Sequence, residues 1–255
     1  MRFTRPLMTL CASALMAFSA AGTGWSSDLQ DLSAKERDAF RAEVRAYLLD
    51  NPEVLMEAIS VLEQRQAQQA EVSDRQMVAN NAAALFETST DLVLGNPNGD
   101  ITIVEFLDYR CGYCKKAHPE VNALLENDGN IKLIVKEFPI LGDASVLASR
   151  FAIATHIVAG DAAYADVHEA LMNAGNNVTE GSLKRLLRGT DVDVDAVMET
   201  MNSEEVTKII VTNRALGQAM QISGTPSFVF ETEMLRGYVP YDRMIQLVTE
   251  LRAEG

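Results

Sequence analysis

Cysteine is scarce in this chain, which has only three cysteines among its 255 residues. Exported proteins that depend on disulfides for stability carry several spaced pairs. Cys111 and Cys114 enclose almost no chain, so a bond between them would restrict the unfolded state very little, and Cys11 lies in a segment that we expect to be removed. The sequence therefore excludes a disulfide-stapled scaffold and indicates that Cys111 and Cys114 are present for their reactivity.

Positive charge is also in short supply, because 22 Lys and Arg residues stand against 36 Asp and Glu residues, a formal net charge of -14 at pH 7. A surface of this sign repels the phosphates of nucleic acid. We therefore expect no nucleic-acid partner. No low-complexity tract or tandem repeat is present, and the length and apolar content suffice for one substantial core with a smaller appendage.

Histidine is rare as well, with three residues in the chain. His118 follows Cys114 by four positions, so the two share a helical face and could bind a metal together with Cys111. A closed structural site needs a fourth ligand that is not evident, so we favour a partly exposed histidine that tunes local charge. His156 and His168 have no cysteine or acidic ligands at metal spacing and are interpreted as structural. We predict neither a metal site nor an organic cofactor.

The N-terminal segment has the features of a secretory signal peptide. It contains Arg2 and Arg5 without an acidic residue, followed by an apolar stretch from residue 7 to about residue 21 and then small residues. A retained membrane anchor is the alternative, but the stretch is short of the ~20 apolar residues that a spanning helix needs. We predict that residues 1–27 are cleaved and that the mature protein lies in an exported compartment, most simply a bacterial periplasm.

Residues 28–90 are predicted to form an N-terminal helical arm. Residues 33–36 match a capping box, residues 51–53 carry a second helix start signal, and no Gly or Pro follows before residue 95. One long helix or two abutting helices are therefore expected. Residues 63–71 contain no large apolar side chain, so this stretch cannot bury itself against a core. We favour an arm that mediates self-association; a solvated helical spacer is the alternative.

From about residue 91 the pattern changes to that of an α/β domain. Two β-branched runs, residues 101–107 and 131–137, predict buried strands. A helical stretch of about residues 112–126 lies between them, and the right-handed crossover that this βαβ unit requires makes the strands parallel.

The rest of this domain, which we place at residues 91–255, is predicted to begin with a helical insertion. Residues of about 143–220 are rich in Ala, Leu, Met and Val at helical spacing, with glycines as breaks, which indicates four or five short helices. A hairpin at about residues 227–237 and a last helix at about residues 241–252 follow. The order of the core elements is thus βαβ, helices, ββα.

Cys111 and Cys114 form a C-x-x-C motif that follows a strand and opens a helix. Such a motif alone is either a redox couple or half of a metal site. The helix start places Cys111 near unpaired backbone N–H groups and the positive end of the helix dipole, which stabilise a thiolate. Arg110, Lys115 and Lys116 add positive charge nearby. We predict that Cys111 is the nucleophile and that the less exposed Cys114 is the resolving thiol.

The resolving thiol must lose a proton before it reacts. Glu105 lies near the middle of an otherwise apolar strand, six residues before Cys111, and is expected to point inward beneath the cysteines. A buried carboxyl has a raised pKa and can exchange protons near neutrality. An exposed position on the strand is the alternative. Pro226 directly precedes a strand, where a cis peptide bond is possible.

Three segments together resemble the DsbA-like family of periplasmic thiol-disulfide oxidoreductases. They are residues 106–115 (FLDYRCGYCK), 136–142 (KEFPILG) and 224–228 (GTPSF), and the resemblance covers about residues 91–254. It implies a thioredoxin-like fold with a helical insertion, here preceded by the helical arm.

The resemblance also implies a substrate-binding site. It implies that Pro226 is cis and packs beside the cysteines, that the backbone at Thr225 pairs with an extended substrate segment, and that Glu105 is the buried acid. We place Gly112 and Tyr113, the two residues between the cysteines, in the same site.

The sequence departs from the most oxidising members of this family. Those enzymes usually have Pro-His between the cysteines, whereas this chain has Gly112 and Tyr113, as the DsbC isomerases do, and Thr225 before the proline in the DsbC manner. Losing the histidine destabilises the thiolate and makes the disulfide less oxidising. The combination with a helical arm resembles the ScsC-type proteins, some of which oligomerise through that arm.

We therefore predict a periplasmic disulfide isomerase or reductase that acts on protein thiols and disulfides, depends on a membrane redox partner and self-associates through residues 28–90. A monomeric dithiol oxidase is the alternative within this chemistry. A second class is a Cu(I)-handling binding protein that uses the two thiolates, which are soft ligands. A third is an interaction module whose cysteines are incidental.

Overall fold

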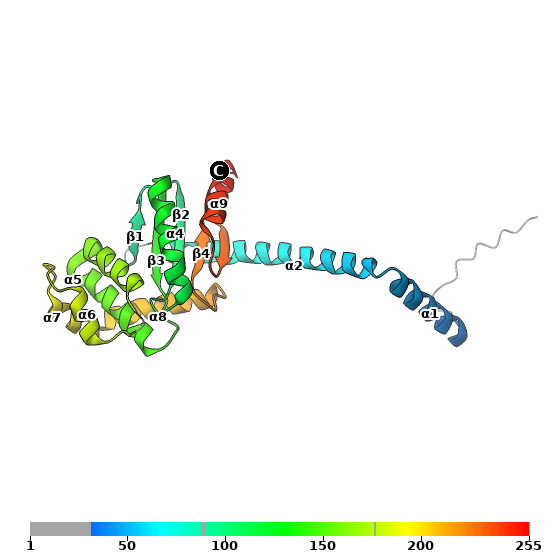
Figure 1. Cartoon of the computed structure of the whole chain (residues 1–255), viewed down its shortest axis with the longest axis horizontal. Helices are drawn as coiled ribbons and strands as arrows, with labels where there is room; N and C mark the ends of the chain where they lie inside the picture. Colours follow the sequence, from blue (N-terminus) through cyan, green and yellow to red (C-terminus); the bar gives the residue numbers. More distant parts are fainter. Residues whose placement is uncertain (1–31, 88–89, 176, 255) are drawn as a thin grey trace, which may run out of the picture. The chain divides into compact units, whose positions relative to one another are not determined.

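The computed structural model describes residues 32–87, 90–175 and 177–254 (Figure 1). The signal peptide predicted for residues 1–27 lies outside the described residues. The chain divides into two compact units, with the boundary between Leu62 and Glu63.

The first unit consists of helices whose apolar side chains remain exposed. Helix α1, Ala34–Asp50, begins at the predicted capping box, in which the Ser33 hydroxyl accepts a hydrogen bond from the backbone N–H of Glu36 and the Glu36 carboxylate accepts one from the backbone N–H of Ser33. Helix α2, Glu53–Asn80, begins in this unit and continues into the next. No residue of α1 is buried, so this helix has no core of its own within the chain.

The second unit is built around a five-stranded mixed sheet with the strand order β1-β3-β2-β4-β5. The strands are β1 Leu92–Gly95, β2 Ile101–Leu107, β3 Ile131–Glu137, β4 Ser227–Phe230 and β5 Glu233–Arg236. Strands β2 and β3 are parallel and the other neighbouring pairs are antiparallel. Both parallel strands have the bounds predicted from their β-branched runs, and helix α4, Gly112–Asp128, connects them.

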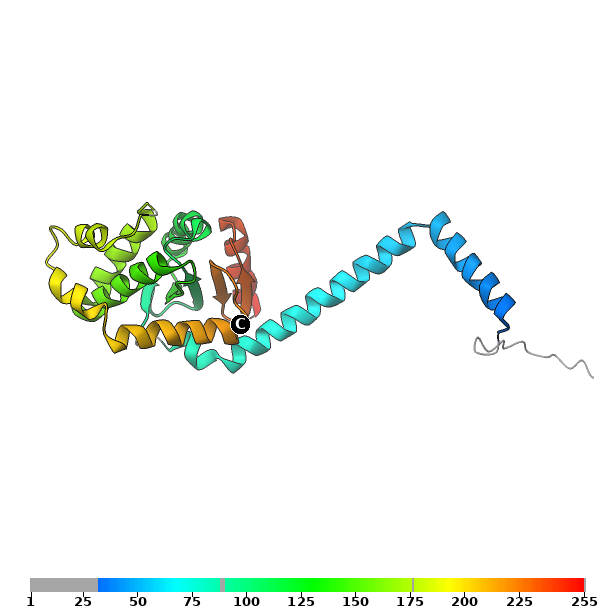
Figure 2. The same ribbon diagram turned by 90° about the horizontal axis from the view of Figure 1, so that it is seen from below.

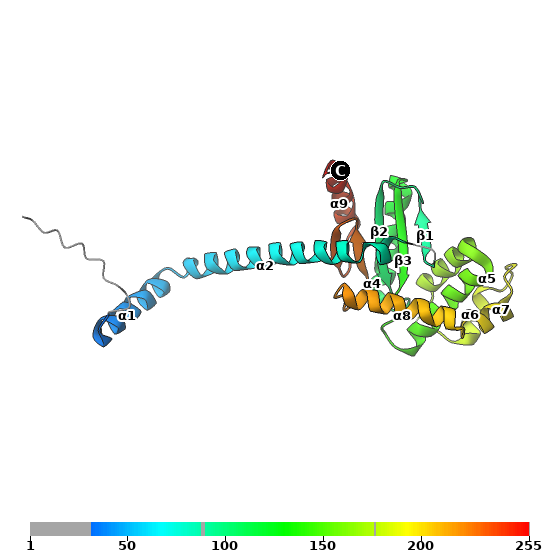
Figure 3. The same cartoon turned by 180° about the vertical axis from the view of Figure 1, so that it is seen from behind.

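Helices cover both faces of this sheet. The remaining ones are α3 Ala82–Phe86, α5 Asp143–Asn173, α6 Glu180–Leu186, α7 Val194–Thr200, α8 Glu204–Ala219 and α9 Tyr241–Glu254. Alternate residues of β2 enter two separate cores, as the period of two in a strand requires. Ile103 and Leu107 pack with α4, α5 and α9 on one face, whereas Val104 and Phe106 pack with α8, α3 and the end of α2 on the other. Figure 3 shows α2 and α8 on this second side of the sheet.

The helical insertion has the number of helices that was predicted. Asp143–Asn173 (α5) consists of two helices joined at Gly160, and α6, α7 and α8 follow, which makes five within the described residues. Gly160 breaks α5 with a φ of 80°, a left-handed conformation that glycine adopts without steric cost. By length and composition α5 would suffice to cross a membrane, but Phe151, Tyr164 and Leu171 pack into the core of this unit. Figure 2 shows α5, α6 and α7 gathered at one end of the sheet, whereas α8 runs along one of its faces.

Strand β1 was not predicted, and the helix expected up to residue 94 ends earlier. Helix α2 stops at Asn80, the short α3 follows, and β1 pairs with β3 at the edge of the sheet. A buried ion pair of 2.6 Å between Asp91 and Lys136 accompanies this pairing. Neither glycine nor proline marks the end of α2, and the pair Asn80 and Asn81 is the local stop signal there.

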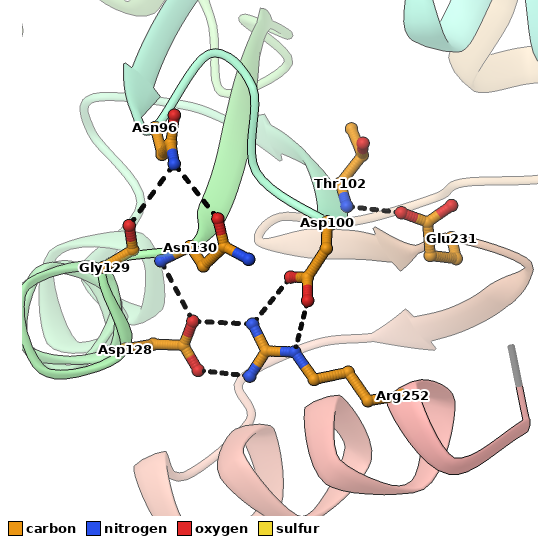
Figure 4. Close-up of polar contacts among 8 residues, drawn as sticks. All are labelled: Asn96, Asp100, Thr102, Asp128, Gly129, Asn130, Glu231 and Arg252. Atoms are coloured by element: carbon orange, nitrogen blue, oxygen red, sulfur yellow. Dashed lines mark hydrogen bonds and ion pairs between the residues drawn. The ribbon is translucent and has the colours of Figure 1, made fainter.

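The end of the sheet opposite the cysteines is fixed by a cluster of charges (Figure 4). The guanidinium group of Arg252 in α9 donates hydrogen bonds to both carboxylate oxygens of Asp100, before β2, and to both of Asp128, at the end of α4. Bidentate pairs of this kind set orientation as well as distance. The clamp holds α4 and α9 in place against the start of β2.

Candidate active site

The two cysteines lie where β2 leads into α4. Cys111 is the N-cap residue of α4, and its backbone N–H donates to the carbonyl oxygen of Asp108 (2.9 Å). The Cys111 residue is 7% exposed and Cys114 is 0% exposed, and both are free thiols. The sequence prediction that Cys114 is the less accessible of the two agrees with this geometry.

The Cys111 thiol is strongly acidified by its surroundings. A hydrogen bond from the Cys114 thiol is the largest cause, and hydrogen bonds from Thr225 and from backbone N–H groups of α4 add to it, lowering the pKa of Cys111 to about 5 against the opposing effect of burial. Cys111 is therefore mostly a thiolate at neutral pH, the reactive form of cysteine.

The cationic residues around the motif contribute less than the sequence suggested. Lys115 donates to the carbonyl oxygen of Ala174, and Lys116 lies 3.9 Å from the centre of the Tyr238 ring. Because both lysines are engaged elsewhere, they add little to the stability of the Cys111 thiolate. Hydrogen bonds at the start of α4 stabilise it instead.

Cys114 has the opposite environment. Burial, the hydrogen bond to Cys111 and the charge of Glu105 raise the pKa of the Cys114 thiol far above its ordinary value. This thiol keeps its proton until a nearby group accepts it. The pair thus combines one ionised and one neutral sulfur.

Glu105 points into the core, as the sequence indicated, rather than onto an exposed face. It is 3% exposed, and its Oε1 atom has no hydrogen-bond partner among the described residues. Burial first, and the neighbouring Cys111 second, raise the pKa of Glu105 to about 8. A carboxyl of this kind can exchange a proton near neutral pH.

The predicted substrate-binding residues lie around Cys111. The peptide bond between Thr225 and Pro226 is cis, and the carbonyl oxygen of Thr225 is 3.0 Å from Cys111 Sγ. The side chain of Tyr113 is 63% exposed, and no atom stands within 4 Å of the position where a Cβ on Gly112 would lie. Both residues between the cysteines are open to an incoming chain.

Asp108 is a site residue that the sequence analysis did not identify. Its fully buried carboxylate accepts hydrogen bonds from the backbone N–H groups of Arg110, Ile140 and Leu141. The loop that follows β3 is therefore fastened to the turn before Cys111. An aspartate two residues before a turn N–H is the available sequence signal, but its bonds to the distant loop have none.

His118 and His168 are buried, whereas His118 was predicted to be partly exposed. His118 is 6% exposed and its Nε2 atom lies 2.6 Å from a carboxylate oxygen of Glu169. His168 lies 3.1 Å from the Tyr109 hydroxyl, and His156 pairs with Asp161. Over residues 32–87, 90–175 and 177–254, no group of three or more His, Cys, Asp or Glu side chains could hold a metal ion.

Two family models match the sequence. The model described as DSBA-like thioredoxin domain matches residues 102–249. The chain belongs to this family, one of thiol-disulfide oxidoreductases. The model described as Copper resistance protein ScsC N-terminal domain matches residues 36–69, which comprise most of α1 and the first part of α2.

Solved structures of whole proteins resemble this DSBA-like chain over most of its length. BcfH of Salmonella enterica Typhimurium is 30% identical, with a TM-score of 0.69, and the match covers 85% of this chain and 95% of that one. A linker-deletion mutant of Proteus mirabilis ScsC is 25% identical, with a TM-score of 0.65, over 88% of this chain and 99% of that one. The fold and layout predicted from the sequence are confirmed.

Curated relatives match over shorter stretches. Disulfide bond formation protein D of Bacillus subtilis is 25% identical over 168 residues, which are 61% of this chain and 74% of the relative. Na(+)/H(+) antiporter NhaA 3 of Salinispora tropica is 27% identical over 138 residues, 54% of this chain. The match spans only 21% of that antiporter's length, about a fifth.

Proposed function

We propose that this protein is a periplasmic thiol-disulfide oxidoreductase that reduces or isomerises protein disulfides. The observation that carries the proposal is the asymmetry of the cysteine pair. An acidified sulfur, Cys111, lies beside the cis peptide bond at Pro226, and a neutral sulfur, Cys114, is buried behind it. This arrangement suits attack on a substrate followed by resolution from within.

The reaction begins with the Cys111 thiolate. It attacks one sulfur of a client disulfide, the client S–S bond breaks, and a mixed disulfide forms while the other client sulfur leaves as a thiolate and takes a proton from water. Cys114 then transfers its proton to Glu105 and attacks Cys111 Sγ, releasing the second client thiol. The client gains two electrons and the protein ends with a Cys111–Cys114 disulfide.

Isomerisation uses the same first step and a different second one. The released client thiolate attacks another sulfur of the client, and a client thiolate finally displaces Cys111 from the mixed disulfide. No net oxidation occurs, so Cys111 returns to its starting state. Net reduction instead requires an external reductant, and we assign that role to a membrane redox partner protein.

Glu105 is the proposed proton acceptor for the resolving step. It is buried in the same core as the cysteines, and its charge is among the causes that raise the pKa of Cys114. This means that the two groups interact across a short, poorly screened distance. Because the pKa of Glu105 is about 8, the carboxyl can both accept the proton and return it to solvent at neutral pH.

The acidity of Cys111 is intermediate between that of a reductase and that of a strong oxidase. A pKa of about 5 lies between the values of about 7 and about 3.5 found in thioredoxin and in the strong oxidant DsbA. One pKa unit corresponds to about 30 mV in a two-electron couple. On that scale we expect a reduction potential of about -165 to -210 mV, a range that includes the value of about -180 mV for protein disulfide isomerase.

The surface around Cys111 suits an unfolded protein client. Tyr113, Ile140 and Leu141 are exposed apolar side chains, and the last two belong to the loop that Asp108 fastens beside the active-site turn. We assign substrate binding to Gly112 and Tyr113, and to the backbone at Thr225 and Pro226, where an extended client segment could add as a strand. Apolar contact would then retain a client that exposes its core.

We further propose that residues 28–90 form an arm through which copies of this chain associate. Within the first unit a groove is lined by apolar side chains of α1 and the start of α2, namely Phe40, Val44, Leu48, Leu49 and Leu55. Soluble monomers rarely leave such contiguous apolar surface uncovered. An oligomer would present several dithiols to one misfolded client, which favours this interpretation over that of a simple spacer.

The reduction potential is the first test, measured by equilibrating the mature chain with reduced and oxidised glutathione. We expect a value between about -165 and -210 mV. A value near about -120 mV would instead identify a dithiol oxidase and contradict the proposed direction of reaction. The same samples, titrated with Cu(I), test the binding-protein alternative, which requires copper to be retained at neutral pH.

A further inference from the structure

A further buried acid lies at the end of β3, the strand that pairs with the strand of Glu105. The Glu137 side chain is 2% exposed. Its Oε1 atom accepts hydrogen bonds from the hydroxyl groups of Tyr109 (2.6 Å) and Tyr164 (2.8 Å). Both phenols are buried, so water does not compete for these bonds.

One of these phenols belongs to the turn that carries the nucleophile. Tyr109 precedes Cys111 by two residues. Both lie in the turn that is closed by a hydrogen bond from the backbone N–H of Cys111 to the carbonyl oxygen of Asp108 (2.9 Å). Tyr164 comes from the middle of α5 and has no place in that turn. A change at the Glu137 carboxylate is therefore transmitted to Cys111 through Tyr109 and not through Tyr164.

The Glu137 carboxyl group is only half satisfied. Its Oε2 atom lacks a hydrogen-bond partner among the described residues, as do the buried hydroxyl groups of Ser145 and Ser149 in α5. Ser149 lies close enough to lower the pKa of Glu137 without completing a full hydrogen bond to it. Buried polar atoms without a protein partner are uncommon.

Opposing effects of its surroundings bring the pKa of Glu137 close to neutral pH. Burial is the largest cause and, with the charge of Asp108, raises the pKa of Glu137 to about 7, while the nearby Ser149 hydroxyl and the hydrogen bonds from Tyr109 and Tyr164 oppose that rise. Both charge states are populated at neutral pH. The backbone oxygen of Glu137 is held separately, by the side-chain amide of Asn213 in α8.

The groups beyond the two phenols do not add a competing charge. His168, which contacts the Tyr109 hydroxyl, is neutral because burial and the nearby His118 lower its pKa to about 3. Asp91 lies on the far side of Tyr164 and is paired with Lys136. The charge of Glu105 also acts on Tyr109, and the pKa of Glu105 is about 8, so the two carboxyls together are the groups whose ionisation the Tyr109 phenol experiences near neutral pH.

We propose that Glu137 is a positioning residue for the thiol-disulfide reaction, which acts through the hydrogen bond from Tyr109 on the turn that carries Cys111. This inference rests on the proposed function, because it takes Cys111 as the nucleophile. When the carboxyl ionises, the phenol bond becomes charge-assisted and about twice as strong. The turn is then held more firmly, and Cys111 reacts faster at an unchanged thiolate concentration.

The test measures the rate at which iodoacetamide alkylates Cys111 between pH 6 and 8.5, in the full mature chain with Glu105→Gln as the background. That substitution removes the other acid that titrates in this range. The thiolate fraction of Cys111 is nearly constant over these pH values because its pKa is about 5, and the neutral Cys114 does not react. We expect the rate to rise about two- to fivefold with a midpoint near pH 7, the scale of one strengthened hydrogen bond.

Three near-isosteric variants distinguish a positioning role of Glu137 from a purely structural one. Glu137→Gln and Tyr109→Phe should abolish the rise in rate. Tyr164→Phe is the matched control: it removes the other phenol from the same oxygen, so the rise should persist but move to higher pH. Near-UV circular dichroism shows whether each variant is folded. An unchanged midpoint and amplitude in folded Glu137→Gln would overturn the inference, as would loss of the rise in Tyr164→Phe.

A separate measurement distinguishes failure of the inference from failure of the proposed function. Reduction of a protein disulfide is followed in the Cys111→Ser variant without other changes. Activity that survives in that variant would refute the proposed function itself. Loss of activity there, together with a Glu137→Gln variant that keeps the parent's pH profile, would refute only the role of Glu137.

Discussion

The two compact units of this chain differ in the burial of their apolar side chains. In the second unit, alternate residues of β2 are buried in cores on both faces of the sheet. In the first unit, no residue of α1 is buried, and Phe40, Tyr47 and Leu49 are among its exposed apolar side chains. A core that closes on itself supports a reactive site, whereas an open apolar helix calls for a partner. The comparison teaches that the candidate active site and the proposed association surface belong to different parts of the sequence.

Removing the nucleophile should have the largest effect and should be confined to the second unit. Cys111→Ser is expected to abolish reduction of a protein disulfide, because the Cys114 thiol keeps its proton and is buried. Cys114→Ser should instead trap the mixed disulfide with the client, visible as an added mass under non-reducing conditions. Light scattering should give the same molar mass for both variants as for the parent. A change in assembly would contradict the separation of the two units.

The next effect concerns stability and arises from the two buried acids. The folded-state pKa of Glu105 is about 8 and that of Glu137 about 7, both above the ordinary value of 4.5. The folded chain therefore binds more protons than the unfolded chain, and the stabilisation is complete below pH 4.5 and lost as pH rises to 8. The stabilisation should be roughly 3 to 5 kcal/mol for each carboxyl, since one pKa unit is about 1.4 kcal/mol.

Guanidinium unfolding of the oxidised chain at pH 5 and pH 8 measures this effect. The pH dependence of the parent should be steeper than that of Glu105→Gln or Glu137→Gln. The neutral, buried His168 gives an opposing pH dependence, but it is common to all three proteins and cancels in the differences. Equal pH dependence in parent and variants would mean that the two carboxyls titrate as exposed groups.

A pair of single substitutions should sharpen the contrast with the smallest effects. A Cβ at Gly217 would lie 2.6 Å from Cζ of the Phe138 ring, so Gly217→Ala should destabilise the second unit by about 1 to 3 kcal/mol through overpacking. Leu48→Glu in α1 should change the stability of the second unit by about 0.5 kcal/mol or less. It should nevertheless lower the molar mass in solution, because a charge would enter the proposed interface.

The outcome of this last comparison is read from two measurements. Urea unfolding followed by circular dichroism reports on the second unit, and light scattering reports on assembly. Gly175→Ala, where no atom lies within 4 Å of the added carbon, is the control for the glycine substitution. An unaltered molar mass for Leu48→Glu would favour a solvated spacer over an oligomerising arm.

The sequence predicted those elements whose signals are local. Strands β2 and β3 follow from their β-branched runs, and the start of α1 follows from its capping box, because each pattern is complete within a few residues. Strand β1 was missed for the converse reason. Its four residues at the edge of the sheet carry little pattern.

The candidate site divides in the same way. Cys111, Cys114 and the inward position of Glu105 were predictable from one motif and one strand. The bonds of Glu137 to Tyr109 and Tyr164 span 28 and 27 positions, and those of Asp108 to the loop after β3 span more than 30. Such contacts exist only after the sheet and α5 have assembled, so no local spacing announces them.

The exposed Tyr113 beside Cys111 offers a contact at which client binding could be followed by fluorescence. The chain has a single tryptophan, Trp25, which lies within the predicted signal peptide. The mature protein would then emit only tyrosine fluorescence, and light that selectively excites indole would pass through it without response. The binding of a client peptide with one tryptophan against the Tyr113 ring could then be followed, because all of the indole emission would come from the client.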